Sequence, residues 1–493
     1  MTHGALATPH RLATEAGAQA LRDGGNAIDA AVAANAVLCV VYPHMTSIGG
    51  DLFALVWPAG EAEPVGLEGA GRSGSRASIT AMRERGFEGT TMPERGIETV
   101  TVPGTVQAWG RLLERFGTFG MGAALDGAVS VARDGFVIGA NLARHLAAYA
   151  TLLMSDRETA RTLPALKEGM QLRQPDLAST LTTIARGGWA PFYFGEVGHA
   201  IATAIEKRDG FVTAGDMSGH RGAWTAPISM NYRDLTIYDM PPPSQGLVAL
   251  AFLRRLESWT RDELEPAPAF ARRFAELRDV CYELRSRYIT DPDFRPVPEA
   301  PFLDADAHGD TVYLCSADEH GNVVSLIQSI AYEFGSGIVA DGTGVLLQNR
   351  GCYFSLDALA ANRLEPNKRT MHTLIPALAA RGGGPVCVFG TMAGEGQPQI
   401  RTQVAINLFD RRLGPAEAVA APRIRVAPGG APLWVEADYP GAAVLGRGGA
   451  GRAVELVPPR DDRMGHAQAI FIDGPRAWRA GADPRSDGSV AIV

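Results

Sequence analysis

The chain changes character at the sequence Gly-Asp-Thr, residues 309–311, and this change restricts the fold more than any other feature. Upstream, residues 110–210 and 246–290 place Leu and Ala at helical spacing between charged faces, which predicts helices. Downstream, residues 311–330 predict two strands around a polar DEHG turn, and short strands between glycine-rich loops follow with little helix. The fold must therefore join a helix-rich first part to a strand-rich second part.

The N-terminal residues predict two helices and a strand. Residues 10–23 form an amphipathic pattern that the glycines of DGG end, and Asn26 is placed to cap a second, alanine-rich helix over 27–40. The turn YPHMTSIGGD (42–51) then leads into the apolar strand FALVWP. Later, the stretch ISMNYRDLTIYDM has a strand-like pattern and ends at a triple proline, which cannot continue a strand ladder.

The composition argues against several classes of function. The net charge is 46 − 54 = −8, so the chain lacks the basic face of a nucleic-acid-binding protein and the polybasic anchor of a membrane-bound one. No apolar run reaches the roughly 18 residues of a membrane span, and the N-terminus lacks a signal-peptide pattern. The 5 cysteines have no C-x-x-C spacing. We therefore expect a cytoplasmic protein with reduced thiols and no nucleic-acid or membrane partner.

The common motifs of metal and nucleotide chemistry do not occur in the sequence. It has no HExxH, no Cys/His ligand spacing, no GxSxG and no GxGxxG after a strand, and its 10 histidines are scattered. The glycine-rich stretch 446–452 lacks the Lys-Ser/Thr ending of a phosphate loop, so we interpret it as a surface turn. We expect neither a metal nor a cofactor.

Thr311 is the candidate for the catalytic nucleophile. Read alone, it is a β-branched residue at the start of a strand. A Thr hydroxyl is a weak nucleophile unless a base is nearby. If Thr311 became the first residue of a new chain, its own α-amine, which titrates near pH 8, could act as that base. The cleavage could be autocatalytic, because the Thr311 hydroxyl could attack the Asp310 carbonyl and form an ester that water releases.

Seven blocks of sequence, in order and spanning nearly the whole chain, resemble the γ-glutamyltransferase family. They are GGNAIDAAVAAN (24–35), YPHMTSIGGD (42–51), TVPGTVQAW (101–109), PPPSQG (241–246), GDTVYLCSADEHGNVVSLIQSI (309–330), FGSGIVADGTGVLLQNRG (334–351) and ADPRSDG (482–488). The resemblance implies an α+β fold, a four-layer αββα sandwich of the N-terminal-nucleophile hydrolase type with two stacked antiparallel sheets between helical layers. It also implies a precursor that splits between Asp310 and Thr311 into 1–310 and 311–493 subunits, both interleaved in one unit.

The same resemblance assigns the catalytic residues. Thr311 matches the nucleophile, and Ser329 matches a hydroxyl residue that supports the nucleophile and its amine; the alternative is an ordinary exposed strand serine. Ala393 and Gly394 in GTMAGEG fall where the family's oxyanion-hole amides lie. Such backbone N–H donors stabilise the charge of a tetrahedral intermediate by a few kcal/mol.

The substrate-binding residues depart from the family pattern. Tyr353 stands where the family has an acidic residue that grips the substrate's α-amine, and Arg350 stands where a neutral or acidic residue is usual. His372 and Thr373 replace the paired serines that hold the α-carboxylate, and Arg72 is the nearest match for the arginine of that site. The pocket has lost an anion and gained a cation, which favours a free carboxylate over an ammonium group.

The leading hypothesis is a self-processing Thr-nucleophile amidohydrolase that cleaves a small carboxylate-bearing amide, on the branch of oxamate amidohydrolase and the cephalosporin (glutaryl) acylases. The alternatives are a γ-glutamyl (glutathione) hydrolase or transferase with altered amine recognition, and a pseudoenzyme that never matures and acts by binding. Arg350 has the alternative of a structural arginine paired with Asp or Glu. We expect the binding partner to be a small-molecule amide substrate. Whether the two-subunit unit forms a dimer is left open by the sequence.

Three features have simpler interpretations. PPPSQG shapes a loop wall, Asp51 after Gly-Gly caps a helix or turn, and His466 is a core histidine with satisfied hydrogen bonds.

Overall fold

The computed structural model describes residues 3–302, 312–447 and 452–493. The sequence predictions for the first two helices hold. Helix α1 spans Arg11–Arg22 and α2 spans Ala27–Val41, and Asn26 caps α2 in a capping box with Asp29. All 15 residues of α2 are buried, as its nearly uninterrupted run of apolar residues requires.

The first large sheet has seven strands, and neighbouring strands are antiparallel. Its order is β20 (Ser489–Ile492), β1 (Gly4–Thr8), β9 (Val312–Asp318), β10 (Val323–Ser329), β2 (Asp51–Trp57), β3 (Val65–Gly69) and β6 (Ala223–Thr225). The two strands predicted around the DEHG turn, β9 and β10, thus lie in the middle of this sheet, between strands from the first part of the chain.

The second large sheet has six antiparallel strands. Its order is β19 (Ala477–Ala482), β18 (His466–Gly474), β14 (Gly384–Met392), β13 (Ala377–Arg381), β8 (Leu235–Asp239) and β7 (Ile228–Tyr232). The predicted strand-like stretch before the triple proline forms β7 and β8. Three small sheets complete the strands: β4 (Phe136–Val137) with β5 (Gln171–Leu172), β11 (Val339–Ala340) with β12 (Val345–Leu346), and β15 (Ile424–Val426), β16 (Leu433–Glu436) and β17 (Val454–Val457).

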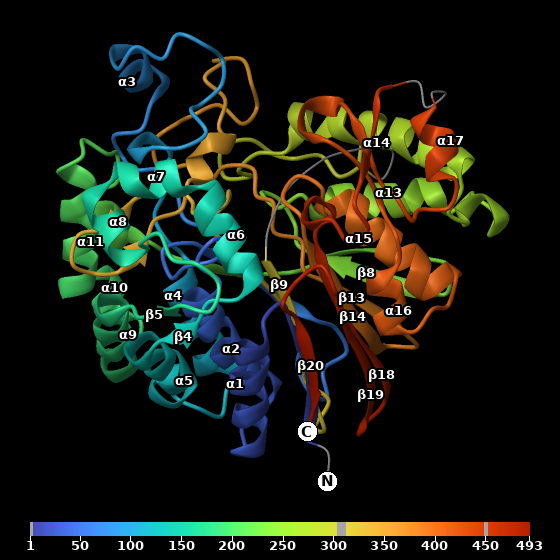
Figure 1. Ribbon diagram of the computed structural model, residues 1–493, viewed down its shortest axis with the longest axis horizontal. Coiled ribbons are helices and arrows are strands. Elements are labelled where there is room, and N and C mark those ends of the chain that lie inside the picture. Colours follow the sequence, from blue (N-terminus) through green and yellow to red (C-terminus); the bar gives the residue numbers. More distant parts are fainter. Residues whose placement is uncertain (1–2, 303–311, 448–451) are drawn as a thin grey trace.

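The two large sheets pack face to face, with β9 against β14 and β18 (Figure 1). The core between them contains Phe53, Tyr313, Val388 and Ile470. The approach is close at Gly390, where an added Cβ would lie 2.5 Å from the Tyr313 ring. A glycine is required there because any side chain would push the sheets apart.

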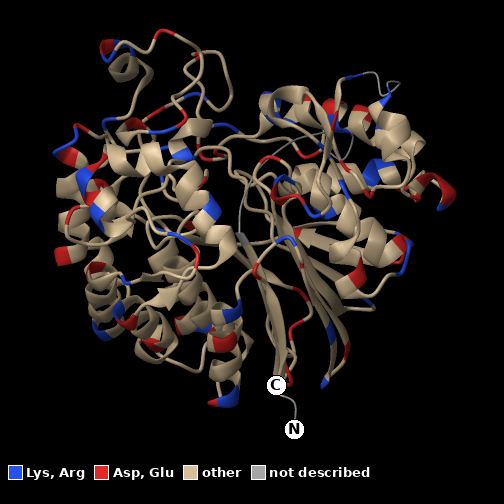
Figure 2. Ribbon diagram, in the orientation of Figure 1, with Lys and Arg blue, Asp and Glu red and all other residues tan. Residues whose placement is uncertain are grey.

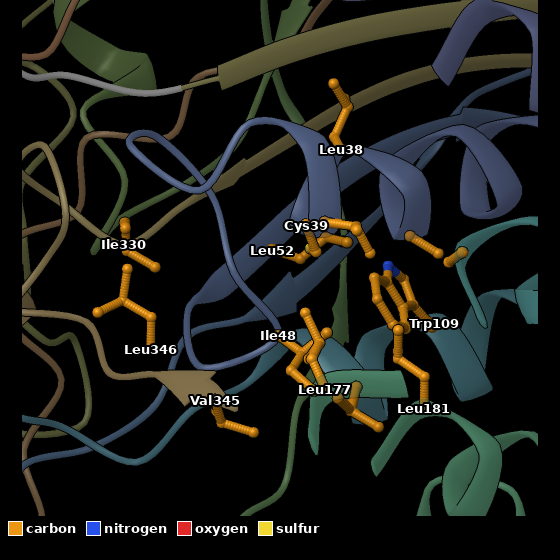
Figure 3. Close-up of a cluster of buried hydrophobic side chains, with 14 of the residues drawn as sticks. Leu38, Cys39, Ile48, Leu52, Trp109, Leu177, Leu181, Ile330, Val345 and Leu346 are labelled. Carbon is orange, nitrogen blue, oxygen red and sulfur yellow. The ribbon is translucent and has the colours of Figure 1, made fainter. Parts of the chain in front are cut away.

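Helices cover the outer faces of both sheets. On the first sheet, α1 contacts β1, and α2 contacts β9 and β10; on the second, α13 (Gly246–Leu256) contacts β7 and β8, α15 (Gln397–Ala405) contacts β14, and α16 (Pro415–Ala420) contacts β18 and β19. Figure 3 shows members of the core beneath α2, among them Cys39 of α2, Leu52 of β2 and Trp109 of helix α4 (Thr105–Phe116). The other helices are α3 (Ile79–Glu84), α4 (Thr105–Phe116), α5 (Met121–Asp134), α6 (Ala140–Ala148), α7 (Ala150–Ser155), α8 (Arg157–Thr162), α9 (Pro175–Gly187), α10 (Ala190–Tyr193), α11 (Glu196–Glu206), α12 (Ala214–Gly219), α14 (Pro268–Tyr288) and α17 (Ala442–Gly446).

One sequence expectation needs correction. We expected little helix after residue 311, but α15, α16 and α17 all lie there, although strands still dominate that part. The sequence of α15, QPQIRTQVA, is polar, and its nine residues are nevertheless all buried. The side chains of Gln399 and Arg401 bond to distant oxygen atoms of the chain, so the helix is buried although it has no apolar stripe.

Several expected features can be compared directly with the structure. All five cysteines are free thiols, and four of them are buried. No helix within the described ranges is long and apolar enough to cross a membrane. Among the same residues, no group of three or more His, Cys, Asp or Glu is arranged to hold a metal ion. Charged residues lie mainly on the outer helices and loops (Figure 2). The predicted surface turn at 446–452 lies largely outside the described residues.

Candidate active site

The predicted cleavage point, Asp310 and Thr311, lies outside the described residues. The strand that follows it fixes the location of the site. Val312, the first residue of β9, pairs with Gln328 of β10, and the next residue of β10, Ser329, pairs with Asp51 at the start of β2. The end of the first sheet from which β9 begins is therefore bordered by Ser329 and Asp51.

Ser329 is a buried residue at a sharp turn. Its side chain is 1% exposed, and its Oγ accepts a hydrogen bond of 2.8 Å from the Ala331 N–H. Ala331 has a φ of 79°, a left-handed conformation that is uncommon for a residue with a side chain. The interpretation of Ser329 as an exposed strand serine is therefore wrong, and its supporting role in catalysis stays a prediction.

Arg350 is fully buried at the start of the 3₁₀ turn η3 (Arg350–Tyr353). Its Nη1 donates a hydrogen bond of 2.8 Å to Thr373 Oγ1, and its guanidinium carbon lies 5.4 Å from the centre of the Tyr353 ring. Its Nε and Nη2 have no hydrogen-bond partner among the described residues. The structure thus joins three of the predicted substrate-binding residues, Arg350, Tyr353 and Thr373, and no carboxylate in the described ranges forms a salt bridge with Arg350.

His372 and Asp51 form a buried pair next to Arg350. His372 Nε2 lies 3.0 Å from Asp51 Oδ2, and Asp51 Oδ1 accepts hydrogen bonds of 3.0 Å from Gln348 Nε2 and from the Gly71 N–H. The interpretation of Asp51 as a simple cap misses this role: Asp51 is fully buried and links β2, the segment before Arg350 and the segment before β13.

Burial sets the charge states of this pair. It raises the pKa of Asp51 to about 7, although the nearby positive charge of Arg350 and the hydrogen bonds oppose the rise. Burial, reinforced by the Arg350 charge, lowers the pKa of His372 well below its usual value. His372 is therefore neutral at physiological pH, and Asp51 changes its charge near neutrality.

PPPSQG forms part of the wall behind His372, as its interpretation as a loop wall predicted. Gln245 donates from its N–H to the His372 carbonyl at 3.0 Å, and His372 donates to the Pro243 carbonyl at 2.7 Å. The backbone of His372 is therefore held on both sides. This restricts how far its ring can move away from Asp51.

Ala393 and Gly394 lie in the turn between β14 and α15. Gly396 donates to the Ala393 carbonyl at 2.8 Å, and Gly394 has a φ of 56°, which favours glycine. In the described part of the chain, the N–H groups of Ala393 and Gly394 donate to no acceptor. The next residue, Glu395, is close enough to Cys352 of η3 for its charge to act on that thiol, whose pKa burial raises to about 12. The turn therefore lies near the Arg350 segment.

Arg72 belongs to a different group of ion pairs. Its Nη1 and Nη2 lie 3.1 Å and 2.5 Å from Asp291 and Asp293, and Arg369 joins Asp291 to Glu68. No hydrogen bond connects Arg72 to the Arg350 group within the described ranges. Its predicted role in holding the substrate stays a prediction.

His466, predicted as a core histidine, is confirmed as one. It is fully buried, its Nε2 lies 2.6 Å from Asp462 Oδ1, and its Nδ1 lies 3.4 Å from the Tyr42 hydroxyl.

Comparisons with known proteins show which family the chain resembles. The Gamma-glutamyltranspeptidase family pattern matches residues 13–493. The glutathione hydrolase-like YwrD proenzyme of Bacillus subtilis is 36% identical, covering 99% of this chain and 98% of the relative. The oxamate amidohydrolase proenzyme of Klebsiella pneumoniae is 34% identical, covering 99% of this chain and 98% of the relative. The crystal structure of cephalosporin acylase from Bacillus halodurans superimposes with a TM-score of 0.89 at 33% identity. The match covers 99% of this chain and 96% of the acylase chain.

These relatives define the protein as an enzyme of the N-terminal-nucleophile type, an amidohydrolase or acyltransferase. The chain belongs to the γ-glutamyltranspeptidase family. The predicted resemblance to the amidohydrolase and acylase branch is confirmed, and so are antiparallel sheets combined with helices.

Proposed function

We propose that this enzyme is a self-processing amidohydrolase, with Thr311 as nucleophile, that cleaves a small amide whose acyl group carries a free carboxylate. The observation that carries the substrate class is Arg350, a fully buried cation with two nitrogens that no described residue uses. Leaving a buried charge without a partner costs several kcal/mol. A substrate carboxylate would supply the missing acceptor and could bind the guanidinium in bidentate fashion.

The neighbours of Arg350 support this assignment. Thr373 holds Nη1, so Nε and Nη2 are the donors left for a ligand. Tyr353 lies at the position where the family grips an α-amine, and a phenol offers no negative charge to an ammonium group. Asp51 is an anion next to Arg350, but its contacts turn it toward Gln348, Gly71 and His372. The group therefore favours an anionic acyl chain over a zwitterionic one.

The proposed reaction begins with cleavage of the precursor between Asp310 and Thr311, which yields the 1–310 and 311–493 subunits. The freed α-amine of Thr311 then takes the proton from its hydroxyl, which attacks the substrate carbonyl. The amine returns the proton to the leaving nitrogen, and the acyl group stays on Thr311 as an ester. Water, deprotonated by the same amine, attacks that ester and releases the acid.

The turn after β14 is suited to the charge that develops in this reaction. The N–H groups of Ala393 and Gly394 have no acceptor in the described chain, which is the arrangement expected of donors kept for an oxyanion. Ser329 borders the end of the sheet where β9 begins, and its hydroxyl is positioned by the Ala331 N–H. We assign Ser329 to support of the nucleophile and its amine.

We also infer that the layers form the four-layer αββα sandwich of N-terminal-nucleophile hydrolases. Support comes from the contacts of β9 with β14 and β18 between the sheets, and from the contacts of α2 and α15 on their outer faces. In this arrangement β9 would place its first residue between the sheets, close to the turn after β14.

A second candidate is a γ-glutamyl or glutathione hydrolase, and the observation that favours it is the 36% identity to a glutathione hydrolase-like relative. A direct comparison separates the two. Purified enzyme is assayed with glutaryl-p-nitroanilide and γ-glutamyl-p-nitroanilide, which differ only by the α-amine. We expect kcat/KM to be at least tenfold higher for the glutaryl compound. A preference for the γ-glutamyl compound would overturn the proposed substrate class in favour of the second candidate.

A further inference from the structure

A cavity of ≈ 480 Å³ lies on the second sheet, apart from the candidate active site. Its lining comes from the turn between β7 and β8, the chain after α13, the end of β13, the π-helical turn η4 (Ile406–Asp410) with the residues after it, and strands β18 and β19. None of the predicted site residues that the structure describes borders it. Its volume falls in the range of pockets that bind small molecules, roughly 300–1,000 Å³.

Arginines dominate the lining. Five line the cavity, Arg233, Arg261, Arg381, Arg412 and Arg479, against two carboxylates, Asp234 and Asp410. The local balance is thus 5 − 2 = +3. The whole chain has a net charge of −8, so the charge of this concave surface is opposite in sign to that of the molecule. A basic hollow on an acidic protein concentrates small anions.

The five arginines differ in whether a carboxylate already forms an ion pair with them. Arg233 Nε lies 2.9 Å from Asp410, Arg381 Nε lies 2.9 Å from Asp234, and Arg479 Nε lies 2.7 Å from Asp473. Arg261 and Arg412 form no ion pair with any residue that the structure describes, and both are exposed. These two cations are therefore free for a ligand, and the others can contribute through their remaining nitrogens.

The backbone around the cavity is unusual in two respects. Arg233 and Arg412 have φ values of 56° and 58°, a left-handed conformation that costs about 1 kcal/mol or more for a residue with a side chain. Between α15 and Arg412, the chain forms the π-helical turn η4, a rare element that is frequent at functional sites. Two of the cavity arginines are thus presented from strained backbone.

Aromatic side chains form the remaining walls. Trp259, Phe409 and Phe471 line the cavity beside the arginines. The guanidinium carbon of Arg479 lies 4.9 Å from the centre of the Phe471 ring, which holds the cation over an apolar surface. A ligand that fits this lining combines negative oxygens with a flat apolar ring.

We propose that this cavity binds a phosphorylated small molecule that carries a planar ring, of the nucleotide class. Planar guanidinium groups match phosphate oxygens in bidentate fashion, and the aromatic walls match the ring. Arg261 and Arg412 are the main phosphate-binding residues. The site does not depend on maturation at Thr311 or on the substrate of the active site.

The test is isothermal titration calorimetry in low-salt, magnesium-free buffer, with ATP, inorganic pyrophosphate and adenosine as probes. ATP should bind at least tenfold more tightly than pyrophosphate, and adenosine should not bind measurably. In the double variant Arg261→Gln/Arg412→Gln, ATP should bind at least tenfold more weakly than in the native protein. Arg186→Gln, on the exposed face of α9, should leave binding unchanged and serves as the control.

Three results would overturn the proposal. They are no ATP binding at millimolar concentration, ATP binding that the double variant does not weaken, and pyrophosphate binding as tight as that of ATP. Melting temperatures of all variants, measured alongside, show whether lost binding reflects lost folding. If the double variant melts well below the native protein, the single variants Arg261→Gln and Arg412→Gln replace it, each with an expected loss of at least threefold.

Discussion

Arg350 and Thr373 come from different segments of the chain and meet through one hydrogen bond of 2.8 Å between Nη1 and Oγ1. Both residues are fully buried. The bond fixes the plane of a guanidinium group whose Nε and Nη2 have no partner in the described chain. A planar, fixed and unoccupied fork of donors is what recognition of a carboxylate requires.

The first prediction concerns the charge of Arg350. Arg350→Met should lower kcat/KM for glutaryl-p-nitroanilide about hundredfold, the loss of one or two charge-assisted hydrogen bonds of about 1.5–3 kcal/mol each. The uncharged butyryl-p-nitroanilide should change less than about threefold. The free energy of unfolding should stay the same or rise, because the variant removes a buried cation that lacks a salt bridge. Equal losses for both substrates, or marked destabilisation, would indicate a structural arginine.

The second prediction follows from the pKa of Asp51, raised to about 7. Below this pH the Asp51 carboxyl is protonated, and Arg350 attracts an anion without competition. Above it, ionised Asp51 competes for the Arg350 charge. For a coupling of about 1.4 kcal/mol between ionised Asp51 and the bound anion, the inhibition constant of glutarate should therefore rise by about fivefold between pH 6 and 8.

Asp51→Asn removes the titration and should give a glutarate inhibition constant that no longer changes across this range. The neighbouring His372 does not add a charge change of its own, because burial lowers its pKa and keeps it neutral across this range. Measuring inhibition at each pH separates binding from the titration of the nucleophile's amine. An unchanged pH profile in Asp51→Asn would contradict the account.

The third prediction concerns the donors after β14. Ala393→Pro removes one N–H and should lower kcat by about 10²–10³ with little change in KM, the usual effect of losing an oxyanion donor. Ala393→Gly keeps the N–H and should retain kcat within about threefold. A melting curve checks that the proline variant is folded. Equal activity in the proline and glycine variants would rule out the Ala393 N–H as a donor to the transition state.

The fourth prediction tests the packing of the two sheets. Gly390→Ala places a methyl group where an added Cβ would lie 2.5 Å from the Tyr313 ring, so the variant should lose about 1–3 kcal/mol of unfolding free energy. Gly384→Ala lies on the same strand with nothing within 4 Å and should change stability by less than about 0.5 kcal/mol. Chemical denaturation measures both. Similar stabilities would mean that the sheets are not closely packed at Gly390.

Sequence patterns predicted the elements whose signals are local. Helix α2 has its cap at Asn26 and a long apolar run, and β9 and β10 are consecutive strands around one turn. Helix α15 could not be predicted this way, because Gln399 and Gln403 satisfy their amides on the carbonyls of Val426 and Ile424. A buried polar helix of this kind has no apolar periodicity from which it could be predicted.

The candidate site shows the same limit. The resemblance pointed to Arg350, His372 and Thr373, and the structure brings them together. The sequence around Asp51 indicates only a cap, because the role of Asp51 depends on His372, which lies 321 residues away. The local signal is a carboxylate at the first position of a fully buried strand, where its oxygens need hydrogen-bond partners. Sequence alone does not reveal which residues those partners are.

The central claim is that Thr311 cuts its own chain and then serves as the nucleophile. Intact-protein mass spectrometry of the purified enzyme tests it most directly. The native protein should give two masses, those of 1–310 and 311–493, and Thr311→Ala should give one uncut mass and no amidase activity. Thr311→Ser, which keeps a hydroxyl, should still split, though more slowly. An uncut native protein with amidase activity, or a Thr311→Ala protein that splits at the same point, would contradict the account.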